Sequence, residues 1–237
     1  MPQHVGGKSR LKKDIYNSIK EDLKGKEVKD FIEPFCGGLH ITQMFYNEYD
    51  TYCGDNGKDL IYMYNYLKHN DMPDMPNITR EKYLKLKEEE QSFEKSFALY
   101  HCSYRGKYSG GYIEPEYEGK PRKRHLSAYN GLKKYSDVIK KVKSFECKDY
   151  KEFTEQVRDG GHLIYCDPPY INTLNCYEVN NFNTEEFWKI MKQWKDMGNY
   201  VYVSEKICPI ANEVIYEKEI NKLGNGKTFL DKLFKIA

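Results

Sequence analysis

The stretch "KDFIEPFCGG" (residues 29–38) predicts a short strand that ends in a glycine turn. A helical pattern follows in "LHITQMFYNEY" (39–49), and "TYCGD" (51–55) predicts the next strand, which ends at Asp55. A strand, a glycine turn, a helix and a second strand in this order form the βαβ unit of a parallel sheet. We therefore expect an α/β fold built around this unit.

The segments on either side extend the same pattern. "RLKKDIYNSIKEDL" (10–23) repeats an apolar residue every four positions, which predicts a helix. Further along, "HLIYCD" (162–167) and "YVYVSE" (200–205) predict strands, with a helix between them in "TEEFWKIMKQWKDMGN" (184–199). The apolar positions of that helix, Phe187, Ile190, Met191 and Trp194, fall on one face and indicate core packing.

The middle of the chain differs in composition. A proline-containing start leads into a charged helix, and "YHCSYRGKYSGGYIEPEYEGKPRKRH" (100–125) predicts a hairpin or a long loop. We interpret residues 69–144 as an inserted lobe, mostly helical with a hairpin. Residues 1–68 and 145–237 then form the sheet domain.

Composition indicates a folded protein whose charge is unevenly distributed. Hydrophobic residues make up 39% of the 237 residues and aromatic residues 15%, which suffices for a large core despite 31% charged residues. The formal net charge is only +2, yet residues 120–143 hold nine lysines and arginines against a single acid, Asp137. Such a cluster favours a phosphate-binding surface.

The cysteines and the N-terminus bear on the location of the protein. Seven cysteines are scattered without a Cys-x-x-Cys pair or zinc-type spacing, which favours a reduced protein without a metal site. The N-terminus lacks the apolar run of a signal peptide, and no segment is apolar over the length of a membrane span. We expect a cytoplasmic protein that makes no use of a membrane.

The glycine turn and Asp55 together suggest a nucleoside site. A glycine turn at a strand end lets the backbone approach a ligand, and a carboxylate at the end of the next strand suits ribose hydroxyls. The alternative is an ordinary tight turn at Gly37-Gly38 with Asp55 as a surface cap. These features alone leave both interpretations open.

The tetrapeptide "DPPY" (167–170) is more specific. Two prolines fix the backbone and remove two amide donors, so that nearby carbonyl groups remain free to accept hydrogen bonds. A carboxylate and a free carbonyl can both accept from one amino group conjugated to a heteroaromatic ring, and Tyr170 could stack on that ring. The alternative is a proline-rich surface loop after a strand.

Four motifs in a fixed order carry a resemblance to a known family. "HVGGKSRL" (4–11), "FIEPFCGG" (31–38), Gly54-Asp55 and "DPPY" (167–170) resemble, over nearly the whole chain, the Dam-type (alpha-group) DNA adenine-N6 methyltransferases. The resemblance implies a Rossmann-like, S-adenosylmethionine-dependent methyltransferase sheet with an inserted target-recognition lobe. It also implies a site-specific enzyme that methylates the exocyclic N6 amine of a flipped adenine in double-stranded DNA.

The resemblance also implies roles for individual residues. The catalytic residues are Asp167, Pro168, Pro169 and Tyr170, with Asp167 and the Pro168 carbonyl binding the target amine. The residues that contact the cofactor are His4, Gly7, Lys8, Glu33, Pro34, Phe35, Cys36, Gly37, Gly38, Asp55, Asp149, Tyr150 and Asp167, where Asp149 and Tyr150 come from "ECKDY" (146–150). No metal is required, because a sulfonium is already a strong electrophile.

The lobe is the expected site of DNA contact. Lys120, Arg122, Lys123 and Arg124 are expected to contact phosphates or a groove, and Tyr104 and Arg105 to read bases or fill the vacated stack. Lys107 and Tyr108 are also expected to bind DNA. The alternative for both groups is a solvated loop. We expect a monomer in solution, with the number of copies on DNA left open.

Three positions depart from the family pattern, and other functions compete with the one proposed. His4 stands where a larger aromatic residue is usual, "FCGGL" (35–39) lacks a third glycine, and "SEK" (204–206) replaces a common Ser-Asn. A cytosine-N4 or an RNA adenine methyltransferase could use the same acceptors, and an inactive DNA-binding relative could keep the fold. The sequence leaves the recognition site open, as it does a phage or a restriction-modification origin.

Overall fold

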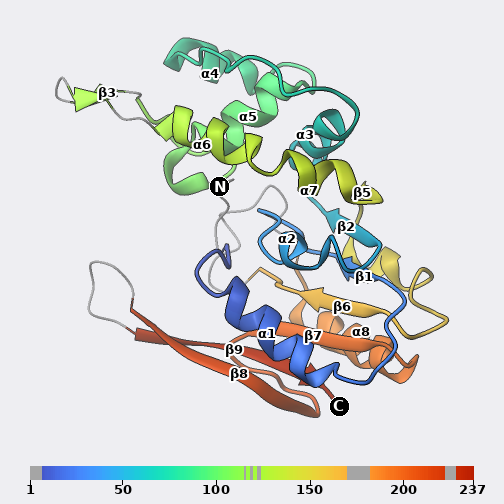
Figure 1. The fold of residues 1–237 in the computed structure, drawn as a ribbon. Helices are drawn as coiled ribbons and strands as arrows, with labels where there is room; N and C mark the ends of the chain where they lie inside the picture. Colours follow the sequence, from blue (N-terminus) through green and yellow to red (C-terminus); the bar gives the residue numbers. More distant parts are fainter. Residues whose placement is uncertain (1–6, 115, 118–119, 122–123, 170–181, 222–227) are drawn as a thin grey trace.

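A mixed sheet forms the centre of the protein. The computed structural model describes residues 7–114, 116–117, 120–121, 124–169, 182–221 and 228–237. Within them lies a seven-stranded sheet in the order β5-β2-β1-β6-β7-β9-β8 (Figure 1). The parallel strands are β5 (Ser144–Cys147), β2 (Thr51–Asp55), β1 (Phe31–Glu33), β6 (Leu163–Cys166) and β7 (Tyr200–Glu205). The antiparallel edge consists of β9 (Thr228–Ile236) and β8 (Asn212–Asn221).

The strand order reverses at β1, in the middle of the sheet. Phe31 pairs in parallel with Thr51 of β2 on one side and with Leu163 of β6 on the other. The chain therefore winds outward from β1 to β2 and β5, and then returns to β6 and β7. This arrangement is the doubly wound, Rossmann-like order, in which ligands bind at the carboxyl ends of the strands where the order reverses. The expected α/β fold is confirmed.

Helices cover the two faces of the sheet because its side chains alternate. In β6, Leu163 and Tyr165 pack with Ile15 and Ile19 of α1 (Lys12–Asp22). Ile164 of the same strand packs instead with the buried side chains of α8 (Thr184–Asp196). Figure 1 shows α1 and α8 on opposite faces. The predicted apolar face of α8 is confirmed, with Phe187, Met191 and Trp194 buried and Ile190 packed against the same cluster.

The residues of the middle segment form a mostly helical lobe beside the sheet (Figure 1). Its helices are α4 (Arg80–Leu86), α5 (Phe93–His101), α6 (Arg124–Lys133) and α7 (Ser136–Lys141), with a 3-10 turn at Tyr104–Gly106. The expected hairpin is present as two short antiparallel strands, β3 (Glu116–Tyr117) and β4 (Lys120–Pro121).

One hydrophobic cluster joins the lobe to the sheet domain. Phe97 of α5 and Ile139 of α7 share it with Tyr64 of α3 (Lys58–His69) and Phe145 of β5. The lobe is therefore packed on the sheet domain over a common core. The boundaries at residues 69 and 144 stay a prediction.

Two local features differ from the sequence-based expectation. The helix expected over 39–49 is reduced to a single turn, α2 (Thr42–Phe45). Its start is delayed because Leu39 adopts a left-handed backbone with φ of 55°. The β8–β9 hairpin was not predicted at all. The six described cysteines are free thiols, and no helix within the described residues is long and apolar enough to cross a bilayer.

Candidate active site at the carboxyl ends of the strands

Carboxylates gather at one edge of the sheet. Glu33 ends β1, Asp55 ends β2 and Glu205 ends β7, while Asp167 directly follows β6. Since β9 runs antiparallel to β7 and pairs Lys232 with Glu205, Asp231 comes to the same edge. The edge coincides with the reversal of strand order, so the fold itself places these side chains where a ligand is expected.

The glycine turn and Asp55 form one hydrogen-bonded unit. The Gly37 N–H donates to Asp55 Oδ2 at 3.1 Å, and the Gly37 carbonyl accepts from Tyr64 Oη at 2.6 Å. Asp55 Oδ1 accepts from the Gly57 N–H at 2.9 Å. Gly37 has a φ of 40°, which a residue with a Cβ adopts only at a cost. Two motifs that the sequence shows eighteen residues apart therefore fix each other.

Leu39 stands where the family pattern has a third glycine, and its backbone keeps the conformation that glycine favours. Its φ is 55° and its side chain is fully buried. A left-handed backbone costs a non-glycine residue about 1–2 kcal/mol, whereas a buried leucine contributes about 1.5–3 kcal/mol. Burial offsets the strain, which explains how the chain tolerates the departure.

Glu33 is a buried carboxyl group at the end of β1. Its side chain is 3% exposed and accepts a hydrogen bond from the Thr42 hydroxyl. Burial raises the pKa of Glu33 to about 8, and the negative charges of Asp167 and Asp55 add to the effect. A cationic group arriving beside Glu33 would favour its charged form.

The raised pKa of Glu33 gives a stability prediction. A carboxyl group whose pKa is about 8 in the folded state and 4.5 ordinarily contributes stability that is complete below the lower value. This stability is lost as the pH rises through the higher value, at up to about 1.4 kcal/mol for each pH unit. We expect Glu33→Gln to flatten the fall in the free energy of unfolding between pH 5 and pH 8, as measured by urea denaturation.

An exposed acid provides the control for Glu33→Gln. Glu185 lies on the surface of α8 in an ion pair with Lys189, so Glu185→Gln should leave the pH dependence of the wild type in place. If the free energy of unfolding changes with pH in the same way in Glu33→Gln and in the wild type, the pKa of Glu33 is not raised by folding.

An aromatic wall borders the glycine turn. The rings of Phe35 and Tyr150 stack with their centroids 5.3 Å apart, and Phe187 packs edge-on to Phe35 at 5.9 Å. The Tyr150 hydroxyl is buried without a hydrogen-bond partner among the described residues. Burial raises the pKa of Tyr150, so the phenol stays protonated and can donate. A buried polar atom without a partner fits a ligand that brings a hydrogen-bond acceptor.

Asp149, which was predicted to contact the cofactor together with Tyr150, forms hydrogen bonds with the backbone and side chain of the turn that follows it. Its carboxylate accepts from the Lys151 N–H at 3.1 Å, and its own N–H donates to Glu152 Oε1 at 2.8 Å. This capping box opens the short 3-10 helix that carries Tyr150 (Tyr150–Phe153). Asp149 therefore fixes the position of the aromatic wall.

Asp167 forms an ion pair with Lys8 at the mouth of the site. The Lys8 Nζ lies 2.9 Å from Asp167 Oδ1 and 3.3 Å from Asp231 Oδ2. Lys8 is 4% exposed and Asp231 5%, while Asp167 keeps 19% of its side chain exposed. Burial raises the pKa of Asp167 to about 6, Lys8 opposes this shift, and the charges of Asp231 and Glu205 add to it. Asp167 is therefore mainly charged at neutral pH.

The structure brings most of the predicted site residues together. Glu33, the buried Pro34, Phe35, the buried Cys36, Gly37, Gly38, Asp55, Tyr150 and Asp167 lie at or near the carboxyl edge, and Lys8 joins them from the start of the chain. Gly7 precedes Lys8 and is exposed; Pro168 is buried and Pro169 partly so. His4 and Tyr170 lie outside the described residues.

The predicted DNA-contact residues have different surroundings. Tyr104 is 57% exposed and Lys107 is exposed as well. Tyr108 is half-buried and donates a hydrogen bond to Asp59 of α3 at 2.7 Å, which ties its loop to the sheet domain. For Arg105, Lys120 and Arg124 the backbone alone is described, and Arg122 and Lys123 lie outside the described residues.

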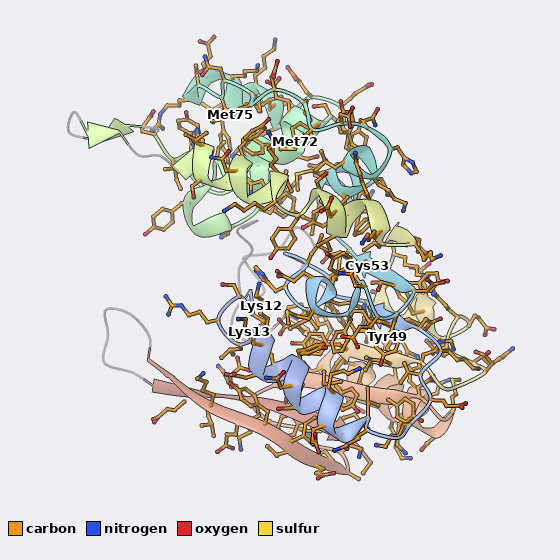
Figure 2. The ribbon with its side chains drawn as sticks, viewed as in Figure 1. Lys12, Lys13, Tyr49, Cys53, Met72 and Met75 are labelled. Carbon is orange, nitrogen blue, oxygen red and sulfur yellow. The ribbon has the colours of Figure 1, made fainter. Side chains whose placement is uncertain are left out.

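The sequence interpretation missed Asp231 at the carboxyl edge of the sheet. It also gave no role to Arg10, which precedes α1, or to Lys13 of α1, and both are exposed. Figure 2 shows Lys12 and Lys13 at the start of α1, on the side of the lobe. Lys12 donates to Gln43 Oε1 at 2.6 Å and so has a partner. The run "KSRLKK" (8–13) was the available signal for a basic edge.

Comparisons with known proteins find a matching family model and several similar chains. Residues 4–225 match the model of the D12 class N6 adenine-specific DNA methyltransferases. The Type II methyltransferase M.MjaIII of Methanocaldococcus jannaschii is 23% identical over 230 residues, which covers 81% of this chain and 78% of that protein. Two structures of the rRNA methyltransferase aviRa from Streptomyces viridochromogenes align at a TM-score of 0.45, with 11% and 10% identity, over 99% of this chain and 87% of theirs.

The family match spans both the carboxyl edge of the sheet and the lobe, since it runs from the segment before Lys8 past Asp167 into β8. The edge it covers holds a carboxylate beside a proline pair, opposite a glycine turn locked to an acid. The chain therefore belongs to the D12 class N6 adenine-specific DNA methyltransferases, enzymes that methylate adenine N6 in DNA.

Proposed function

We propose that this chain is a site-specific enzyme that binds S-adenosylmethionine at the carboxyl ends of β1 and β2 and methylates a flipped adenine held at Asp167. The lobe formed by residues 69–144 selects the DNA sequence. The observation that carries the proposal is the position of Asp167, which lies at the reversal of strand order together with Glu33. Methyl donor and target amine would meet between these two strands.

The residues at the carboxyl ends of β1 and β2 fit the cofactor. Bound there, S-adenosylmethionine would supply a methyl group from a positively charged sulfur that keeps the electrons of the carbon–sulfur bond. Glu33 offers a carboxyl group to a cation, and Tyr150 offers an unused hydroxyl donor beside an aromatic wall. Asp55 offers its carboxylate to ribose hydroxyls while holding the glycine turn. Acidic surroundings suit a cationic ligand.

Asp167 performs the chemistry on the target. With the Pro168 carbonyl it accepts hydrogen bonds from the N6 amine, which moves the amine lone pair out of conjugation and toward the methyl carbon. As the new nitrogen–carbon bond forms, the amine becomes cationic, and Asp167 stabilises that charge and takes the departing proton. A carboxylate whose pKa is raised to about 6 is mainly charged at neutral pH and is still basic enough to receive a proton.

Nucleoside mass spectrometry tests the reaction. The protein is incubated with S-adenosylmethionine and with unmethylated genomic DNA or RNA, and the nucleic acids are digested and analysed. We expect N6-methyladenine in DNA. Finding only N4-methylcytosine, or methylation of RNA alone, would overturn the proposal in favour of the corresponding rival, and no methylation at all would favour a DNA-binding relative without activity.

Sequencing that detects modified adenines in the same treated DNA tests site specificity. Methylated adenines should share one short sequence context, because the lobe reads bases beside the target. Methylation spread evenly over all adenines would contradict a recognition role for residues 69–144.

The basic cluster of the lobe gives a further prediction. If Arg122–Arg124 contact phosphates, replacing all three by glutamine should reduce the slope of log affinity against log salt by about 0.9 for each lost contact. DNA affinity is measured by fluorescence anisotropy at several salt concentrations. A matched control replaces Lys189, Lys192 and Lys195 of α8 by glutamine and keeps the wild-type slope. Equal slopes for all three proteins would show that the cluster is only solvated.

A further inference from the structure

Three parts of the chain meet in one buried ion cluster. Lys8 precedes α1, Asp167 follows β6, and Asp231 lies on β9, yet one ammonium group lies within 3.3 Å of both carboxylates. Lys8 is the buried lysine among the described residues. The reaction proposed above uses Asp167, and it assigns no role to Asp231.

The charge of this cluster depends on Asp231. Two carboxylates and one ammonium carry a net negative charge, whereas a pair of Asp167 and Lys8 alone is neutral. A lysine shared between two acids binds each less completely than a lysine held by one. The Asp167 carboxylate therefore keeps more of its capacity to accept hydrogen bonds when Asp231 holds part of the Lys8 charge.

We propose that Asp231 is a positioning residue for methyl transfer, which shares Lys8 with Asp167 and so leaves the Asp167 carboxylate available to the target amine. The proposal rests on the proposed role of Asp167. Asp231 itself acts through Lys8.

Other charges face Asp167 and remain in any Asp231 variant. Glu205 of β7 raises the pKa of Asp167, and Glu33 of β1 interacts with it electrostatically. The charges of Asp167 and Lys8 also act on the pKa of Tyr165 of β6, the first raising it and the second lowering it. Because these groups are unchanged in Asp231→Asn, the difference from the wild type isolates the Asp231 charge. Removing that charge should lower the pKa of Asp167 by about one unit.

A structural tie elsewhere on β9 supplies a matched control. Asp22 of α1 accepts hydrogen bonds from Lys235 of β9 and from Tyr202, both at 2.6 Å. Like Asp231, it anchors β9 through a carboxylate and a lysine. Asp22→Asn should therefore weaken the fold without changing the charge beside Asp167.

The first measurement is the pH profile of methyl transfer. For Asp231→Asn we expect the acid limb of kcat to move down by about one pH unit and the plateau of kcat to fall about tenfold, with the KM for S-adenosylmethionine within about twofold of wild type. Asp231→Glu should restore most of the plateau. Asp22→Asn should keep the wild-type limb and plateau.

The second measurement does not depend on activity. The Asp167 carboxyl carbon is titrated by NMR in cofactor-free protein labelled with carbon-13 aspartate, and its signal is identified by its loss in Asp167→Asn. We expect the pKa of Asp167 to be lower in Asp231→Asn than in the wild type and in Asp22→Asn. Equal pKa values in all three would overturn the proposal.

The two measurements separate the proposal from the function on which it rests. If the wild type methylates no nucleic acid while the NMR titration shows the expected shift, the proposed reaction fails and the coupling of Asp231 to Asp167 stands. If the wild type is active and Asp231→Asn keeps the wild-type acid limb and plateau of kcat, Asp231 only stabilises the β8–β9 hairpin and the proposal is wrong.

Discussion

Replacing Asp167 with alanine is expected to lower the rate of methyl transfer to DNA by roughly 10²–10³-fold or more, while DNA affinity changes little. The carboxylate is the proposed charged acceptor for the target amine, and removing a group that stabilises developing charge costs a factor of this size. Transfer of a tritiated methyl group to DNA measures the rate, and fluorescence anisotropy measures binding. Because the lobe carries the proposed DNA contacts, binding should survive the substitution.

Asp167→Asn is the conservative companion. Asparagine keeps the volume and one oxygen acceptor but loses the charge that pairs with Lys8, so it should retain the fold and still lose most of the activity. Near wild-type activity in the asparagine variant would show that the negative charge is not needed. A joint loss of activity and DNA binding in both variants would point instead to a folding defect.

Replacing Lys8 with methionine is expected to have the second largest effect. The substitution leaves the buried Asp231 and the partly exposed Asp167 without their shared ammonium, and breaking a buried ion pair from one side costs about 3–5 kcal/mol of stability. It also raises the pKa of Asp167 above its wild-type value of about 6, so that the carboxyl group is protonated at neutral pH. We expect methyl transfer at pH 7 to fall by about 100-fold and to recover partly at pH 9.

The pH dependence of stability follows from the same shift. With a folded-state pKa above the ordinary 3.8, Asp167 in Lys8→Met contributes stability at low pH that is lost as the pH rises through its raised pKa. Urea unfolding at pH 5 and pH 8 should therefore show a larger difference than in the wild type. Lys235→Met, which removes one partner of Asp22 at the other end of β9, serves as control and should show no recovery of activity with pH. Identical pH profiles for the two variants would contradict the role of Lys8.

Much of this architecture was predictable because its signals are local. The strand and glycine turn at 29–38, the strand ending at Asp55 and the apolar face of α8 are each visible within a few residues, and all are confirmed. The order of motifs placed the catalytic carboxylate after β6 for the same reason. A parallel sheet then brings such strand ends to one edge without further information.

What the sequence did not reveal depends on contacts between distant segments. The C-terminal hairpin pairs β9 with β7 in an antiparallel register, and nothing in "TFLDKLFKI" (228–236) states that Asp231 will meet Lys8. The late start of α2 likewise follows from the left-handed backbone of Leu39, which is stabilised by tertiary burial. The hydrogen bond of Tyr108 to the buried Asp59 of α3 was likewise not visible in the sequence, and the expected role of Tyr108 on DNA stays a prediction.

The place of β9 in the sheet also governs when the enzyme becomes complete during its synthesis. This strand is made after every other strand of the sheet, yet it pairs between β7 and β8. A growing chain can therefore form β1, β2 and their glycine turn long before Asp231 has left the ribosome. Until β9 inserts, Lys8 lacks one of its two carboxylates. If Asp231 positions Asp167 as proposed, a chain that is still being translated does not yet have the charge balance needed to modify DNA.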